Sequence, residues 1–132
     1  MELAKQFASL IDTSSFDEAA QLIAEDCAYH YWEGNYQGRD AIVAIYRQNY
    51  LHSRKIFDEI KYSSDVEAMG DGTYKITFLD KYRKGHKWHD FRCFQIITIK
   101  ENLIVEIQHN EIPGEAEALR TFYRIQSNRS KI

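Results

Sequence analysis

An aspartate and a histidine draw attention in this chain because each interrupts the apolar face of a predicted strand. Asp80 shares the inward parity of its strand with Tyr74, Ile76, Phe78 and Tyr82. His109 shares one face of the last predicted strand with Val105, Ile107 and Glu111. A carboxylate can orient an imidazole and leave its other ring nitrogen as an acid or base near neutral pH. The two side chains are therefore candidates for a proton-transfer pair, or for two buried polar groups that only satisfy each other.

Tyrosines provide a second chemical feature. Aromatic residues make up 14% of the chain, with nine tyrosines and seven phenylalanines, which is more than a minimal core needs. Some of these rings are therefore expected to line a binding site. Tyrosine hydroxyls can donate hydrogen bonds to an oxygen that gains negative charge during a reaction.

The N-terminal third of the chain has helical periodicity. Leu3, Phe7, Leu10 and Ile11 form one apolar stripe, which predicts a first helix. Ser15 and Glu18 resemble a capping box, and we expect the second helix to continue to about Asp26. An aromatic segment at 27–32 predicts a strand, a loop follows from Gly34 to Gly38, and a third helix contains Ile42, Ile45, Tyr46 and Asn49.

From residue 56 onward the apolar period changes to two, which predicts a meander of antiparallel strands. The turns fall at Gly70-Asp71-Gly72, at Lys84-Gly85-His86 and at Glu101-Asn102, and the last strand covers 103–112. Pro113-Gly114 ends the sheet, and a closing helix follows it. A chain of 132 residues is the size of one domain, so we expect a single α+β domain at 1–132, with helices on one face of a curved sheet.

The bulk composition argues against several classes of partner. The net charge of −3 provides no positive field for nucleic acid or anionic lipid. Arg120, Arg124, Arg129 and Lys131 are expected to form a solvated helix face. No apolar run approaches the ~20 residues of a membrane span. Cys27 and Cys93 lie far apart without metal-ligand spacing, so we expect both to be reduced and buried in the core. A cytoplasmic location is therefore expected.

Cofactor and metal motifs are absent from the sequence. His86 and His89 would point to opposite faces of a strand, and no further ligand is evident near them. No nucleotide or flavin fingerprint occurs, so we expect no cofactor. Asp90 and Arg92 share one parity and are expected to form an ion pair on the outer face of the sheet.

Two segments resemble a known family. The stretch Ala24-Glu25-Asp26-Cys27-Ala28-Tyr29-His30-Tyr31, followed by Gly38-Arg39-Asp40-Ala41-Ile42, is similar to the signature of SnoaL-like domains in the nuclear transport factor 2-like superfamily. The resemblance implies a cystatin-like cone, in which a curved antiparallel sheet packs against three N-terminal helices and a short C-terminal helix. Ketosteroid isomerases, limonene-type epoxide hydrolases, polyketide cyclases and non-catalytic proteins share this fold, so it leaves the function open.

Family catalytic positions are only partly retained. The resemblance places Tyr31 where ketosteroid isomerases have their aspartate base, and a tyrosine with a reference pKa near ~10 is a poor base at neutral pH. Tyr29 and Asp80 match two residues of the epoxide hydrolases, whereas Tyr31, Phe78 and His109 replace the other three. Neither reaction is therefore carried over to this chain.

The resemblance leaves Asp80, His109, Tyr29 and Tyr31 as candidate catalytic residues. Strand parity and the third helix supply the remaining pocket positions, which are Tyr46, Phe78, Tyr82, Phe91, Cys93, Ile107 and, at the rim, Glu111. Gln95 and Ile97 share the ligand-facing parity of Phe91 and Cys93. The family resemblance implies proton transfer next to a carbonyl, ring closure or water addition, on a small apolar molecule with a carbonyl or hydroxyl group. The alternatives are a non-catalytic carrier that uses the same pocket, and a protein-interaction module with a filled cone.

The outer parity of the strand after residue 86 is also apolar. Trp88, Phe94 and Ile96 lie on that face, where water would otherwise be expected. Because domains of the resembled family commonly dimerise through this side of the sheet, we expect a homodimer that buries these three residues.

Overall fold

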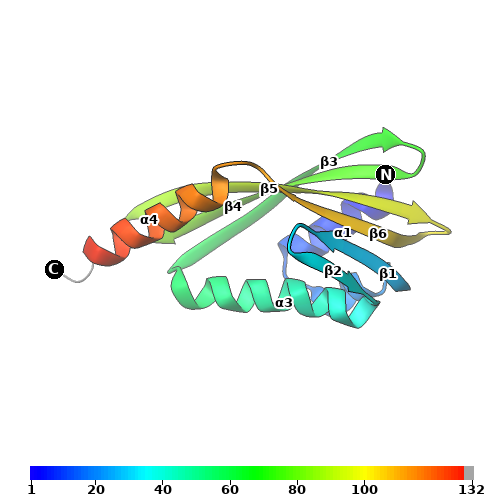
Figure 1. Ribbon diagram of the computed structural model, residues 1–132, viewed down its shortest axis with the longest axis horizontal. Coiled ribbons are helices and arrows are strands. Elements are labelled where there is room, and N and C mark those ends of the chain that lie inside the picture. Colours follow the sequence, from blue (N-terminus) through cyan, green and yellow to red (C-terminus); the bar gives the residue numbers. More distant parts are fainter. Residues whose placement is uncertain (130–132) are drawn as a thin grey trace.

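The structure, a computed structural model, describes residues 1–129 and is an α+β fold (Figure 1). Its four helices are α1 (Glu2–Asp12), α2 (Phe16–Ala20), α3 (Arg39–Ile56) and α4 (Glu115–Arg129). Its strands are β1 (Ile23–Tyr31), β2 (Gly34–Gln37), β3 (Glu59–Gly70), β4 (Thr73–Lys84), β5 (Lys87–Lys100) and β6 (Leu103–Glu111). The predicted fold class is thus confirmed.

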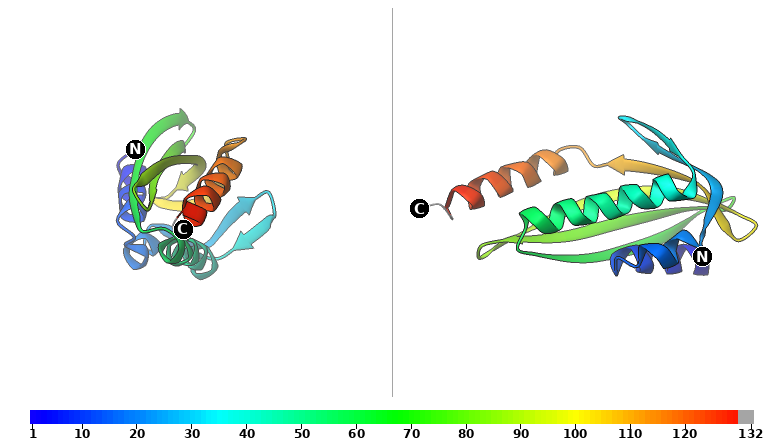
Figure 2. Two further views of the ribbon diagram at one scale, coloured as in Figure 1. Left: turned by 90° about the vertical axis from the view of Figure 1, so that its left-hand side faces the viewer. Right: turned by 90° about the horizontal axis from the view of Figure 1, so that it is seen from below.

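All six strands form one curved sheet in the order β2-β1-β6-β5-β4-β3, which does not close into a barrel. The three N-terminal helices cover one face, and α4 extends past the far end of β4 and β5 (Figure 2). Two details differ from the prediction. The sheet is mixed because β1 pairs with β6 in parallel, and the C-terminal helix is a full 15 residues long.

The second helix is shorter than predicted. Ser15 is its N-cap, but the Ser15 hydroxyl is paired with that of Thr13 at 2.9 Å and makes no capping bond. Helix α2 ends at Ala20, since the carbonyl of Leu22 already accepts a hydrogen bond from Ile104 in β6. Ile23 therefore begins β1, where a β-branched side chain fits a buried strand.

The segment predicted as a loop forms a short strand. Residues 34–37 pair with residues 28–31 of β1 as strand β2, and all four β2 residues are exposed. At the tip of this hairpin the Trp32 side chain is 71% exposed. The Gly-Asn-Tyr-Gln segment carries no apolar alternation, so the pairing with β1 had no signal in the sequence.

The predicted inward parity of the long strands is confirmed. Ile76, Phe78 and Tyr82 of β4 are buried, as are Cys93, Gln95 and Ile97 of β5. Strand β6 departs from the prediction at Val105, which a register shift leaves as an extra residue between Ile104 and Glu106. Because this bulge precedes Ile107, the inward parity of His109 is unaffected.

Several smaller predictions are confirmed on the surface and in the core. Cys27 and Cys93 are free and buried, and Asp90 pairs with Arg92 at 3.9 Å. Arg120, Arg124 and Arg129 are exposed, whereas Lys131 lies outside the described residues. Within residues 1–129 no helix is long and apolar enough to cross a membrane.

Candidate functional site

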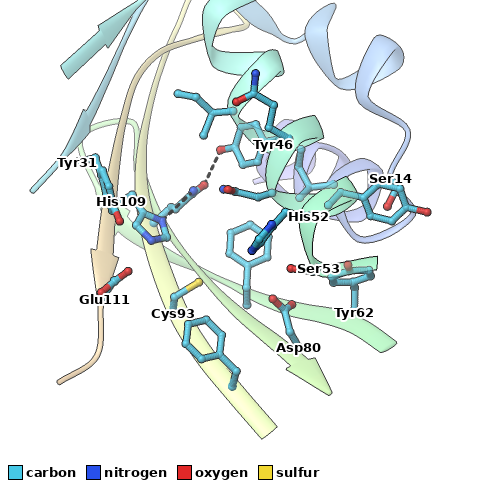
Figure 3. A pocket seen from close by; sticks show the side chains of 18 of the residues that line it. Ser14, Tyr31, Tyr46, His52, Ser53, Tyr62, Asp80, Cys93, His109 and Glu111 are labelled. Atoms are coloured by element: carbon cyan, nitrogen blue, oxygen red, sulfur yellow. Dashed lines mark hydrogen bonds between the residues drawn. The ribbon is translucent and has the colours of Figure 1, made fainter. Parts of the chain in front are cut away.

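A cavity of about 500 Å³ lies between the inner face of the sheet and the helices. Figure 3 shows side chains from α3, β3, β4, β5 and β6 converging on it. Its walls include the aromatic residues Phe16, Tyr29, Tyr31, Tyr36, Tyr46, Tyr50, Tyr62, Phe78, Tyr82 and Phe91. This volume is within the range of small-molecule sites, and ring faces with few polar groups are typical of their walls.

Gln95 is the centre of a hydrogen-bond network on one wall. The Tyr46 hydroxyl donates to Gln95 Oε1 at 2.7 Å, while Gln95 Nε2 lies 3.5 Å from the Tyr29 hydroxyl and 3.2 Å from His109 Nδ1 (Figure 3). Gln95 is only 3% exposed, so it needs these partners in place of water. The network holds the rings of α3, β1 and β6 in one arrangement.

The hydrogen bond from Gln95 determines which ring nitrogen of His109 carries the proton. An amide nitrogen only donates hydrogen bonds, so Gln95 Nε2 requires an unprotonated Nδ1 on His109. Burial lowers the pKa of the imidazole, which favours the neutral ring with its proton on Nε2. His109 is thus set to donate a hydrogen bond from Nε2 and is poorly placed to act as a general base.

Asp80 lies on the opposite wall. Its Oδ2 accepts a hydrogen bond from the Tyr82 hydroxyl at 3.2 Å. Tyr62 on β3 is directly opposite Asp80 in the register of the two strands. Burial raises the pKa of the Asp80 carboxyl to about 7, and the nearby Asp12 carboxylate acts in the same direction. A carboxyl group that titrates near neutral pH can both accept and return a proton.

The strand register separates Asp80 from His109. Asp80 is opposite Phe91 on β5, whereas His109 is opposite Gln95, four residues further along that strand. At about 3.3 Å per residue and about 4.8 Å per strand, their backbones are about 13 Å apart along the strands and about 10 Å across them. Among the described residues the expected direct contact of the two does not occur. Both side chains nevertheless line the same cavity (Figure 3).

Tyr29 and Tyr31 flank His109. The Tyr29 ring stacks on the imidazole with centroids 6.5 Å apart, and the Tyr31 ring lies at 5.5 Å. Burial raises the pKa of both hydroxyls above their ordinary value, so both remain protonated at neutral pH. They are hydrogen-bond donors and not proton acceptors.

Six of the seven predicted pocket residues line the cavity, namely Tyr46, Phe78, Tyr82, Phe91, Cys93 and the exposed Glu111. Burial raises the pKa of the Cys93 thiol to about 12, so this sulfur is a packing group and not a nucleophile. Ile107 was placed wrongly. It is fully buried opposite Ile97 and Tyr29, in the part of the core where the helices close against the sheet.

Other residues line the cavity that were not among the candidate site residues. Strand parity had placed Gln95 on the ligand-facing side and Tyr62 on the apolar side of their strands, and both line the cavity. Asp12 ends α1 and reaches the cavity, where Ser64 donates a hydrogen bond to it at 2.6 Å. A polar residue at the end of a helix normally faces water, so the sequence carried no signal for Asp12.

The structure brings no metal-ligand cluster together within the described part of the chain. His86 is exposed in a turn, and the His89 ring stacks on Phe122 of α4 at 5.1 Å. His89 is therefore a packing residue beneath the C-terminal helix.

Comparison with known proteins found no matching family model and no matching curated protein. Solved structures do match. One is a candidate polyketide cyclase from Xanthomonas campestris pv. campestris, with 13% identity, a TM-score of 0.68, and coverage of 89% of this chain and 93% of that one. Another is an NTF2-like protein of unknown function from Exiguobacterium sp. 255-15, with 14% identity, a TM-score of 0.64, and coverage of 84% and 98%.

The chain has the NTF2-like fold. A third match is TerC, which was co-crystallized with polyporic acid. It is 7% identical and has a TM-score of 0.68, and the match covers 93% of this chain and 96% of TerC. The fold implied by the sequence resemblance is thus confirmed. At such identities the NTF2-like neighbours say nothing about individual site residues.

Proposed function

We propose that this NTF2-like protein binds a small organic molecule in its cavity and catalyses a cofactor-free proton transfer, with Asp80 as the group that carries the proton. The observation that supports this proposal best is a buried carboxyl with a pKa of about 7 on the wall of a cavity of about 500 Å³. A general acid or base is most effective when its pKa lies near the working pH.

The two walls would act on different parts of the ligand. The Asp80 carboxylate takes a proton from a carbon next to a carbonyl, and the electron pair of the broken C–H bond moves to the carbonyl oxygen. His109 Nε2–H donates a hydrogen bond to that oxygen, as Tyr31 can from the same wall. Asp80 then returns the proton to another carbon, or to a hydroxyl group that leaves as water.

The comparisons support a ligand-binding function in general terms. Neighbours of this fold include candidate polyketide cyclases, and TerC was co-crystallized with polyporic acid. An open cavity also favours a ligand over the interaction-module alternative, for which a filled cone was expected. The carrier alternative differs only in turnover. The free, buried Cys27 and Cys93 are compatible with the predicted cytoplasmic location.

Hydrogen–deuterium exchange tests the proposal without knowledge of the product. Small aromatic ketones and hydroxyketones are incubated with the protein in D₂O, and loss of the signal of the proton next to the carbonyl is followed by NMR. We expect catalysed exchange for at least one compound, and a fall of about 100-fold or more in Asp80→Asn, since removal of a general base typically costs that much.

Asp65→Asn is the matched control for this experiment. It removes one carboxylate from the exposed outer side of β3 and should leave the exchange rate unchanged. A compound that binds the cavity but exchanges no proton above the solvent rate would favour the carrier. Exchange that survives Asp80→Asn would remove Asp80 from the mechanism.

We further propose that the protein forms a homodimer through the outer face of β5. Trp88 is 42% exposed there, and Phe94 and Ile96 are partly exposed. Lys61 lies over the Trp88 ring at 5.0 Å and Lys75 over the Phe94 ring at 4.6 Å, so the two lysines border an apolar surface. A surface of this composition is suited to a symmetric contact with a second copy.

Sedimentation velocity at micromolar concentration should give the mass of a dimer for the wild-type chain. Phe94→Glu should shift it to the monomer, because a charge placed at the centre of the contact would be desolvated on association. Glu18→Gln, on the exposed surface of α2 and away from β5, serves as the control. A wild-type monomer would contradict the proposal.

A further inference from the structure

The charges around the cavity are of one sign. Its lining includes the carboxylates of Asp12, Glu33, Asp80 and Glu111, and none of the lining residues described is a lysine or arginine. The chain contains 17 lysines and arginines, so their absence from this wall is not a matter of composition. A ligand with a net negative charge would be repelled by these carboxylates.

Two of these carboxylates have no counter-charge in an ion pair among residues 1–129. The described ion pairs involve surface acids such as Asp17, Asp58 and Asp90, and none involves Asp12 or Asp80. Asp80 has only the Tyr82 hydroxyl as a side-chain partner, and Asp12 only the Ser64 hydroxyl. A buried carboxylate is costly unless it is paired, and a positively charged ligand would supply the missing partner.

The groups that face Asp80 come from every element around it. They are Asp12 at the end of α1, His52 on α3, Tyr62 on β3, Tyr82 on β4 and Cys93 on β5. None of these five carries a fixed positive charge, although the Arg54 guanidinium lies over the Tyr50 ring at 5.5 Å and acts on the Tyr62 hydroxyl. The Tyr62 hydroxyl is buried, and no described residue makes a hydrogen bond to it, so one further polar atom beside Asp80 has no protein partner.

Aromatic rings complete the environment of a cation. Seven tyrosines and three phenylalanines line the cavity, and the negative faces of such rings attract a positive charge. Rings of this chain already bind cations at the surface: the Arg54 guanidinium, which is not part of the lining, lies over the Tyr50 ring at 5.5 Å. A metal ion would require at least a third ligand, and no such cluster exists among the described residues.

We propose that the ligand of this cavity is an organic cation, a protonated amine or quaternary ammonium compound with an apolar body, whose positive group lies between Asp12 and Asp80 against the tyrosine rings. This inference rests on the proposed ligand-binding function and names the chemical class of the ligand. The proposed reaction then requires the acidic carbon to lie next to the positive group, within reach of Asp80, with its carbonyl directed toward His109.

Three probes of nearly equal shape test the charge requirement. Benzyltrimethylammonium carries the charge, neopentylbenzene is its neutral isostere, and phenylacetate is an anion of similar size. Dissociation constants are measured by NMR titration. We expect the cation to bind at least about tenfold more tightly than the neutral isostere, and the anion to bind most weakly.

Two variants locate the positive group. Asp80→Asn and Asp12→Asn should each weaken binding of the cation by about threefold to tenfold and leave the neutral probe unchanged. Asp65→Asn, which removes an exposed carboxylate from the outer side of β3, should affect neither. Circular dichroism of each variant verifies the fold, which both cavity variants should retain because asparagine is not charged.

The outcomes separate the inference from the function on which it rests. If the neutral isostere binds as tightly as the cation, or if neither cavity variant weakens the cation, the cation proposal is wrong and the proposed ligand-binding function stands. If none of the three probes binds at 10 millimolar concentration, on the order of the weakest affinities measured for fragments, both are overturned.

Discussion

Asp80→Asn should make the protein more stable at pH 8 by about 4 kcal/mol at most. The pKa of this carboxyl is raised to about 7 from an unfolded value of 3.8, chiefly by burial. Each unit of difference between the folded and unfolded pKa corresponds to about 1.36 kcal/mol, so this interval amounts to about 4 kcal/mol. Asparagine keeps the shape and can accept the Tyr82 hydrogen bond without the cost of a buried charge.

The pH dependence of this difference has a defined sign. Below pH 4 the carboxyl is protonated in both the folded and the unfolded chain, so the two proteins should differ little. Between pH 4 and pH 7 the unfolded chain ionises while the folded chain retains its proton, and the wild type loses stability relative to Asp80→Asn. Above pH 7 the difference should remain constant.

Urea unfolding of both proteins at intervals from pH 4 to pH 8 measures this curve. Asp65→Asn should follow the wild type throughout, because that carboxylate is exposed. A difference that does not change with pH, or a variant that is less stable than the wild type at pH 8, would show that Asp80 is ionised without cost in the folded protein. The same variant should lose the proton-exchange activity, so stability and activity would move in opposite directions.

Ile107→Ala should lower the free energy of unfolding by about 2–5 kcal/mol, the range for truncation of a fully buried isoleucine. Ile107 has no exposed surface and is enclosed by Ile97 on β5 and Tyr29 on β1. Removal of its branched side chain would leave a closed void in this part of the core, which neighbouring strands cannot fill without a change of register.

Ile45→Ala is the matched control for this truncation. Ile45 lines the cavity on α3 and is only partly buried, so the same deletion enlarges a space that is already open. We expect a clearly smaller loss of stability, measured by urea unfolding under identical conditions. Equal losses in the two variants would mean that Ile107 faces the cavity, as the sequence had suggested.

The sequence predicted the orientation of side chains correctly where the strands are long and regular. Alternation along β4 and β5 placed Asp80, Phe78 and Cys93 on the inner face correctly, because their pairing runs from residue 73 to residue 98 without a bulge. The same parity included Gln95, the hub of the network around His109, although its role depends on neighbours that no local pattern reveals.

The sequence was uninformative where position depends on contacts between distant segments. Parity placed Asp80 and His109 on the same face of the sheet. It could not place them relative to each other along their strands, because that depends on strand registers that only the folded sheet defines. Asp12 reaches the cavity because α1 packs across β3, and Ile107 is excluded from it because the helices close over that end. Strand β2 depends on its pairing with β1 alone.

The parallel pairing of β1 with β6 also bears on how this chain folds. Tyr29 and Ile107 are neighbours in the sheet although 78 residues separate them in sequence, so β1 gains its inner partner only after the whole meander has formed. Closure of so long a loop is slow, because its entropy cost must be met before the contacts between the two strands can stabilise it. During synthesis the aromatic strand that carries Tyr29 and Tyr31 therefore leaves the ribosome well before β6, and only the short hairpin partner β2 is available to it in the meantime.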